Sequence, residues 1–198
     1  MNHLAHCFLS FDDEDLLLGN FIGDDIKGSA WKDYPEGVQR GILLHRAIDS
    51  FTDQHAGPRA SKERIRQFAG RYAPAVTDIL YDHLLAIHWE QYSAESFDIF
   101  AQKTYRRLEK RADEMPEVWQ RRLPHMLQGC FLHGYRQRNG LEWVLQQFSR
   151  RIKQESFRES VASGAFPEYF FEHLSLFSED FQAFFPELLA EARAKSGL

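Results

Sequence analysis

The sequence predicts an all-α protein, folded as a single-domain helical bundle. Apolar residues recur at intervals of three and four along nearly the whole chain, and helix breakers fall between these stretches. No stretch alternates apolar and polar residues convincingly, as a half-buried strand does. The chain has 198 residues, 43% of them hydrophobic, which is enough for one complete core. We therefore expect one domain over residues 1-198.

The positions of the helices in the first half of the chain are predicted from capping residues and from glycine and proline residues that end helices. Asp12 is the first candidate cap, and its helix should end at Gly28. A central helix lies between Pro35 and Gly57, and further helices should cover about 58–71 and 74–90.

The helices of the second half are marked in the same way. They are expected over 93–111 with Ser93 as the cap, from Pro116 past Phe131 with a kink or split at Pro124, and from a capping box at Asn139 and Glu142. The tail between Phe157 and Phe185 is dense in aromatic residues, which predicts a core stripe more readily than a ligand pocket.

The central helix carries the most informative polar face. One side of it holds His45, Asp49, Thr52 and Asp53, while the opposite side holds Leu44, Ala47, Ile48 and Phe51. Burying an imidazole and two carboxylates on one face of a helix costs free energy unless hydrogen bonds or opposite charges compensate for the lost water. Metal coordination is one solution. The simpler alternative is a hydrogen bond within the helix between His45 and Asp49, with Arg46 in a surface salt bridge.

Three other places combine imidazoles with carboxylates or amides. They are Asn20 with Asp24 and Asp25, Tyr81-Asp82-His83 followed by His88-Trp89, and the pair His3 and His6. Oxygen and imidazole ligands without thiolates suit Mg²⁺, Mn²⁺ or Fe. Such a metal polarises a phosphoryl oxygen and lowers the pKa of bound water, as phosphoester hydrolysis requires. No nucleotide-binding loop motif is present, and Cys7 beside His6 matches no recognisable nucleophile motif.

Charge is distributed unevenly, although the net charge is only -5. Residues 102–153 contain 12 basic and 5 acidic side chains, whereas the flanking segments are acidic. This middle region is either a docking surface for an acidic partner or a set of solvated helix faces.

The remaining sequence features indicate the cellular compartment of the protein and one class of partner that we do not expect. Cys7 and Cys130 have no CxxC partner, which favours a reducing cytoplasm over a disulfide scaffold. We expect neither a signal peptide nor a membrane span, because the start is acidic and no apolar stretch is long enough. Nucleic acid is not an expected partner.

In the order and spacing of its motifs, the chain resembles the acyl carrier protein phosphodiesterases. The motifs are Met1-Asn2-His3-Leu4-Ala5-His6, then Gly19-Asn20 with Asp24 and Gly28, then His45-Arg46-Ala47-Ile48-Asp49 with Thr52-Asp53, then Tyr81-Asp82-His83 with His88-Trp89. The resemblance is specific up to Trp89. It implies an atypical HD-phosphohydrolase-like enzyme that uses a divalent metal, often Mn²⁺, to remove the 4'-phosphopantetheine arm from holo acyl carrier protein.

The resemblance also implies roles for individual residues. Asp24, His45, Asp82 and His83 would hold the metal, which is Mn²⁺ or alternatively Mg²⁺ or Fe²⁺, and Asp49 would be a further ligand or orient one. Asp53 or His6 would transfer the proton, and Arg46 would meet the phosphate. The adjacent His-Asp pair of HD enzymes is replaced by Asp82-His83 in reverse order. The partner, holo acyl carrier protein, is acidic and would dock on 102–153.

Two other functions remain open at this point. The same metal chemistry would serve an HD-type hydrolase of a small nucleotide. A helical binding protein without catalysis is the alternative from a different class. The oligomeric state does not follow from the sequence.

Overall fold

The computed structural model describes residues 1–197, which form α-helices and short 3-10 helices without any strand. The α-helices are α1 (His3–Phe8), α2 (Glu14–Ile22), α3 (Glu36–Gln54), α4 (Ala56–Ala69), α5 (Ala73–Ile87), α6 (Phe97–Lys110), α7 (Glu117–Gln128), α8 (Arg138–Ser149), α9 (Glu155–Ala162), α10 (Ala165–Glu172) and α11 (Leu174–Ser196). The predicted all-α class is confirmed. The assignment of residues 1-198 to one domain and the likeness to HD phosphohydrolases stay predictions.

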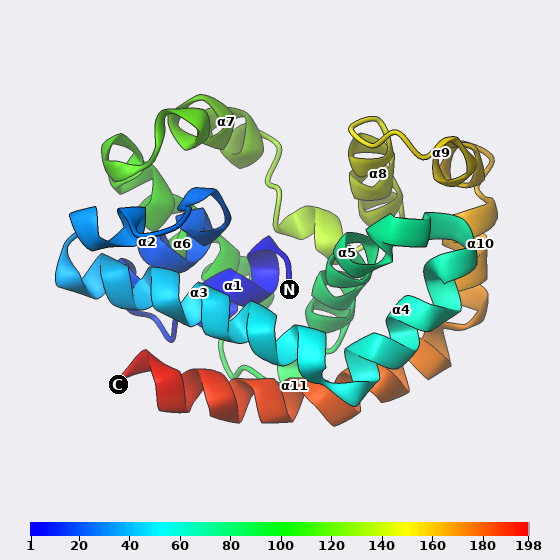
Figure 1. Cartoon of the computed structure of the whole chain (residues 1–198), viewed down its shortest axis with the longest axis horizontal. Coiled ribbons are helices and arrows are strands. Elements are labelled where there is room, and N and C mark those ends of the chain that lie inside the picture. The colour runs from blue at the N-terminus through cyan, green and yellow to red at the C-terminus, as the bar shows by residue number, and fades with distance from the viewer. Residues whose placement is uncertain (198) are drawn as a thin grey trace.

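The long helices frame the molecule. Helix α3 runs beside α11 along one edge, and α7 and α8 lie on the opposite side of the molecule (Figure 1). Helix α1 lies in the interior and contributes to both groups of buried apolar side chains. Its Leu4 and Ala5 pack with the α5 and α11 side chains, whereas Cys7 packs with those of α2 and α7. This central position brings the side chains of α1 next to α2 and α3.

The aromatic tail is core, as its composition predicts. The fully buried members are Phe157, Phe166, Phe170, Phe177, Phe181, Phe184 and Phe185. They pack against one another and against Tyr81 of α5, with ring centroids about 5 to 6 Å apart as aromatic pairs prefer. The C-terminal helices therefore complete the core around α5 and leave the polar residues of α1 to α3 facing one another.

Two glycines allow α2 and α3 to touch backbone to backbone. A Cβ atom added to Gly41 would lie 2.6 Å from the carbonyl oxygen of Leu16 and 2.9 Å from the Cα atom of Gly19. A side chain at Gly19 would likewise meet the backbone of Val38 and Ile42. Real Cβ atoms essentially never approach backbone atoms this closely, so any larger residue would push the helices apart.

Several predicted helix boundaries are wrong for local reasons. The sequence pattern misses α1, which is only six residues long. Helix α2 begins at Glu14 with Asp13 as its cap, because Phe11 and Asp12 form a turn with positive φ angles. It ends at Ile22 and gives way to a 3-10 helix over Gly23–Asp25 instead of reaching Gly28.

The later boundaries shift as well. Ser96, not Ser93, caps α6, because its hydroxyl accepts the Ile99 N–H while Ser93 is used in a turn with Glu95. Helix α7 continues through Pro124 and ends at Gln128, before Phe131. Helix α8 begins at Arg138, so Asn139 lies inside its first turn and cannot form the predicted capping box.

The basic face of α6 is occupied by the acidic start of α2. Asp12 pairs with Lys103 at 2.8 Å and with Arg107 at 2.5 Å, and Asp15 pairs with Arg111 at 2.6 Å. Lys110 pairs with Glu14 at 3.3 Å. These basic side chains, which the sequence suggests as docking candidates, thus hold α6 against α2.

Among the described residues, no helix combines the length and the apolar character that are needed to cross a membrane.

The glycine contact generates a stability prediction. Gly41→Ala should lower the free energy of unfolding by about 1–3 kcal/mol, because the added methyl group overpacks a backbone contact that neither helix can relieve. Thermal denaturation followed by circular dichroism measures this change. Gly134→Ala is the matched control, since a Cβ atom there meets only the tip of Val144 at 3.8 Å. Equal melting temperatures for the two variants would show that the α2–α3 contact yields easily.

Candidate metal centre

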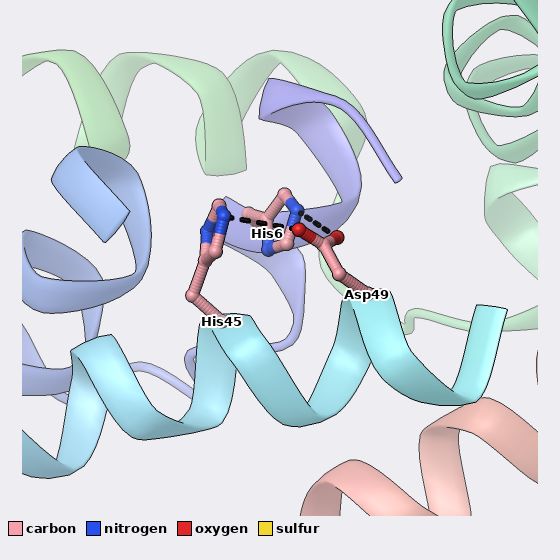
Figure 2. Close-up of side chains that lie close together, drawn as sticks. All are labelled: His6, His45 and Asp49. Atoms are coloured by element: carbon pink, nitrogen blue, oxygen red, sulfur yellow. Dashed lines mark ion pairs between the residues drawn. The ribbon is translucent and has the colours of Figure 1, made fainter. Parts of the chain in front are cut away.

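Two histidines and one aspartate meet where α1 approaches α3. Within residues 1–197, the ligand atoms of His6, His45 and Asp49 lie within 4.8 Å of one another. His6 Nε2 lies 3.3 Å from Asp49 Oδ1, and His45 Nε2 lies 3.2 Å from Asp49 Oδ2 (Figure 2). The two imidazole rings are stacked, with centroids 4.0 Å apart. Both rings thus present the same nitrogen to one carboxylate.

Asn20 of α2 determines which nitrogen each ring presents. The backbone carbonyl oxygen of Asn20 lies 2.8 Å from His45 Nδ1 and can only accept, so His45 Nδ1 carries the hydrogen. The Asn20 amide nitrogen donates to the His6 carbonyl oxygen at 2.7 Å, which leaves Asn20 Oδ1 to accept from His6 Nδ1 at 2.7 Å. Each neutral ring therefore directs the lone pair of Nε2 toward Asp49, as metal-binding histidines do.

The electrostatics of the cluster favour a cation at its centre. Burial alone would lower the pKa of His45, but hydrogen bonds with Asp24 and Asp49 outweigh it and raise the pKa to about 9. Burial and the neighbouring charge of His45 lower the pKa of His6. Burial would raise the pKa of Asp49, yet His45 and His6 hold it well below its usual range. The protein alone thus accommodates one proton between the stacked rings, on His45.

One buried nitrogen atom of the cluster has no hydrogen-bond partner. His6 Nε2 is fully buried and makes no hydrogen bond with good geometry within residues 1–197, although Asp49 lies close. Leaving a buried polar atom without a partner costs about 1–3 kcal/mol. A divalent metal ion bound by His6, His45 and Asp49 would use this nitrogen as a ligand. The donor set of two imidazoles and a carboxylate therefore fits a divalent metal.

Asp24 lies at the open edge of the cluster. It belongs to the 3-10 helix after α2, and its Oδ1 lies 3.3 Å from His45 Nε2. The hydrogen bond with His45 lowers the pKa of Asp24, against the effect of burial. Its side chain is 72% exposed, whereas that of His45 is 4% exposed. Asp24 is thus available as a fourth ligand or as a group that contacts the incoming water.

Asp82 holds α1 in place through hydrogen bonds to its backbone. Its buried carboxylate accepts the backbone N–H groups of Leu4 at 2.7 Å and Ala5 at 3.2 Å, which lie in the first turn of α1. Burial raises the pKa of Asp82 to about 7, against these two hydrogen bonds. Asp82 thus anchors α1, which carries His6, and it lies outside the group that has metal-ligand spacing. Its role as a ligand stays a prediction.

His83 is also outside the cluster. Its Nδ1 donates to the carbonyl oxygen of Tyr135 at 2.7 Å, and its ring packs on Phe170 and Phe171. Because Asp82 and His83 are adjacent on a helix, they point in different directions, and only Asp82 faces α1.

Arg46 and Asp53 both have partners within the protein, and their catalytic roles stay predictions. The Arg46 guanidinium donates to the carbonyl oxygens of Ile26 at 2.9 Å and Gly28 at 3.3 Å, so it fastens the segment that follows Asp24. Asp53 is exposed and pairs with Lys62 at 2.6 Å, one turn beyond Asp49 along α3. His6, predicted as a proton-transfer residue, has the geometry of a ligand.

Two supporting groups escaped the sequence reasoning. Asn20 is recognised there only for its helical spacing with Asp24, and its bonds to both rings require the fold. Asp78 accepts the Met1 amino group, as does Asp49, each at 3.3 Å. The spacing of Asp78 and Asp82, four residues apart on one helix face, is the signal that could have identified Asp78.

Comparisons with known proteins cover nearly the whole chain. Residues 1–188 match the family described as "Acyl carrier protein phosphodiesterase". The chain is 29% identical over 197 residues to the acyl carrier protein phosphodiesterase of Klebsiella pneumoniae, covering 98% of this chain and 99% of that protein. It is 28% identical to the protein of the same name from Salmonella paratyphi A, covering 99% and 100% of the two chains. No solved structure matches.

These matches extend well beyond the first 90 residues that carry the sequence motifs, and they include the helices that close the core. The chain therefore belongs to the acyl carrier protein phosphodiesterase family, a family of hydrolases.

Proposed function

We propose that this protein hydrolyses the phosphodiester that links 4'-phosphopantetheine to holo acyl carrier protein and so releases the apo form. The observation that carries the proposal is the pair of Nε2 atoms directed at Asp49, one of them buried and without a hydrogen bond. The family to which the chain belongs supplies the substrate class. A divalent metal would supply Lewis acidity toward a phosphoryl oxygen and a lowered pKa for bound water.

The chain's own residues have distinct tasks in this proposal. His6, His45 and Asp49 hold the metal, and Asn20 keeps both imidazoles in the tautomer that binds it. Asp24, at the exposed edge, accepts the proton of the attacking water, since a carboxylate within hydrogen-bonding reach can act as a general base. Mn²⁺ is the proposed ion, with Mg²⁺ and Fe²⁺ as alternatives that share oxygen and imidazole ligands.

The proposal also includes the docking surface for the carrier protein. Of the basic residues within 102–153, those on α6 that face α2 are paired with acidic side chains. Arg150 and Lys153, after the last turn of α8, have no ion-pair partner within residues 1–197 and are exposed. Unpaired cations at the rim of an interface act mainly on the encounter with an acidic partner. We therefore place docking at the end of α8.

Substrate identity has a direct test. Purified protein with added Mn²⁺ should release phosphopantetheine from holo acyl carrier protein, detected as the mass loss of the carrier. A panel of nucleotides serves as the comparison and should yield neither phosphate nor pyrophosphate at a similar rate. Preferential hydrolysis of a nucleotide would identify the protein as a nucleotide hydrolase, and inactivity on both would favour a binding protein.

Removal of a proposed ligand should abolish catalysis without unfolding the protein. We expect His6→Ala and His45→Ala to lose bound metal and to slow hydrolysis more than about 100-fold, the upper range for residues that only support a ligand. Metal analysis of the purified variants and helical circular dichroism measure the two effects separately. His125→Ala is the control, because His125 is exposed on α7. Full metal content in both ligand variants would disprove the centre.

Docking is tested by reversing charge. Arg150→Glu combined with Lys153→Glu should raise the KM for holo acyl carrier protein and flatten its dependence on salt, because long-range attraction is screened by ions. Hydrolysis of a small phosphodiester should change little. Arg106→Glu combined with Arg122→Glu changes the net charge equally on α6 and α7, and it should have the smaller effect. Equal effects of the two pairs would mean that only overall charge matters.

A further inference from the structure

Lys27 places a cation at the exposed edge of the candidate metal centre. It belongs to the segment that follows the 3-10 helix Gly23–Asp25, and its Nζ atom donates a hydrogen bond to the backbone carbonyl oxygen of Asp24. The Oδ1 atom of Asp24 lies 3.3 Å from His45 Nε2. The Lys27 ammonium thus contacts a residue that in turn contacts an imidazole of the centre.

The backbone around Lys27 is held by the helix that carries His45. Arg46 directly follows His45 on α3. Its guanidinium donates to the carbonyl oxygen of Ile26 at 2.9 Å and to that of Gly28 at 3.3 Å, which are the residues on either side of Lys27. The Ile26 side chain is buried and anchors the same segment in the core. The backbone of Lys27 is therefore fixed relative to His45, while its side chain is exposed.

No carboxylate neutralises the charge of Lys27. In the described part of the chain, its ammonium forms no ion pair, and its hydrogen bond ends on the carbonyl oxygen of Asp24. Lys62 and Lys103, by contrast, each donate to an aspartate carboxylate, at 2.6 and 2.8 Å respectively. An ammonium carries three N–H donors, and the carbonyl oxygen occupies one of them. Two donors of Lys27 therefore remain available to an anionic ligand.

The proposed reaction requires a cation at this edge. Asp24 marks the open side of the centre, because its side chain is 72% exposed whereas His6 and His45 are buried. The substrate is a phosphodiester anion, and the carboxylates of Asp24 and Asp49 repel it. These two carboxylates together balance the charge of one divalent ion, so the centre keeps no surplus positive charge for the substrate. A lysine ammonium is a compact charge that donates hydrogen bonds to a phosphoryl oxygen and supplies the missing attraction.

We propose that Lys27 binds the phosphodiester group of the substrate, through hydrogen bonds from its ammonium to a non-bridging phosphoryl oxygen, beside Asp24 at the open edge of the centre. This inference rests on the proposed phosphodiesterase function and adds a substrate-binding residue to it. Arg46 is a positioning residue in this arrangement, because its hydrogen bonds hold the segment that presents Lys27. The structural alternative is that Lys27 serves only the Asp24 carbonyl oxygen, as basic side chains do at helix ends.

The first test measures anion binding in matched lysine variants. Lys27→Met removes the charge at similar side-chain length, and Lys27→Arg retains it. Lys32→Met is the control, because Lys32 is also exposed and without an ion pair within residues 1–197, and its ammonium lies over the Trp31 ring. Inorganic phosphate is titrated by calorimetry into each protein equilibrated with Mn²⁺. We expect Lys27→Met to bind phosphate about 10-fold more weakly than the wild type, because a hydrogen bond to a charged group is lost. Lys27→Arg should keep part of this affinity, and Lys32→Met should keep all of it.

Hydrolysis of two substrates gives the second readout. The value of kcat/KM is measured for holo acyl carrier protein and for bis(p-nitrophenyl) phosphate. Lys27→Met should lower it about 10-fold on both, because both substrates contain the phosphodiester that Lys27 contacts. Lys27→Arg should recover part of the loss, and Lys32→Met should resemble the wild type. If the wild type hydrolyses neither substrate but phosphate binding is weakened in Lys27→Met alone, the proposed function fails while the anion contact stands.

Three outcomes would overturn the proposal. Equal phosphate affinity in Lys27→Met and Lys32→Met would remove Lys27 from the phosphate site and leave Arg46, the contact that the sequence predicts. Loss of activity toward the carrier protein alone would place Lys27 in the docking surface. Loss of bound metal or a lower melting temperature in Lys27→Met, without recovery in Lys27→Arg, would show that Lys27 only supports Asp24 and the segment after it.

Discussion

The backbone contact between α2 and α3 is the constraint on which the candidate metal centre depends. Because Gly19 and Gly41 lack side chains, the two helices approach closely enough for the Asn20 carbonyl oxygen to reach His45 Nδ1. Any wider spacing would leave a buried imidazole N–H without an acceptor, and its ring would be free to turn. The close packing of the two helices and the orientation of the His45 ring therefore depend on the same contact. A substitution at either glycine acts on both the stability and the site.

Buried hydrogen bonds hold the histidines of the candidate centre in place. Asp82 accepts the first amides of α1 and so sets the position of His6, while Asn20 orients the rings of His6 and His45. None of these supporting contacts is exposed, so their hydrogen bonds are made in a low dielectric where they are strong and geometrically demanding. The result is that two Nε2 atoms and one carboxylate are directed at a common point. This preorganisation favours metal binding, because little ordering remains to be done.

The basic residues of the middle region lie in two different environments. On α6 the basic residues neutralise the acidic residues Asp12, Glu14 and Asp15 at the start of α2, and exposed pairs of this kind contribute modestly to stability. After α8 the basic residues Arg150 and Lys153 have no such partners within the described chain. A count of charges along the sequence treats the two groups alike. Their environments differ because only the group on α6 lies opposite carboxylates of its own chain.

The sequence by itself determined the helical class and the buried aromatic tail, and it named His45, Asp49, Asp24 and His6 among the candidate site residues. These follow from periodicities of three and four, which are local, and from motif spacing. The tertiary structure decided which candidates meet. Asp82 and His83 are adjacent in sequence, yet one carboxylate turns to α1 and the imidazole turns to Tyr135. The role of Asn20 depends on contacts between segments that are separated in the chain, and helix periodicity carries no information about such contacts.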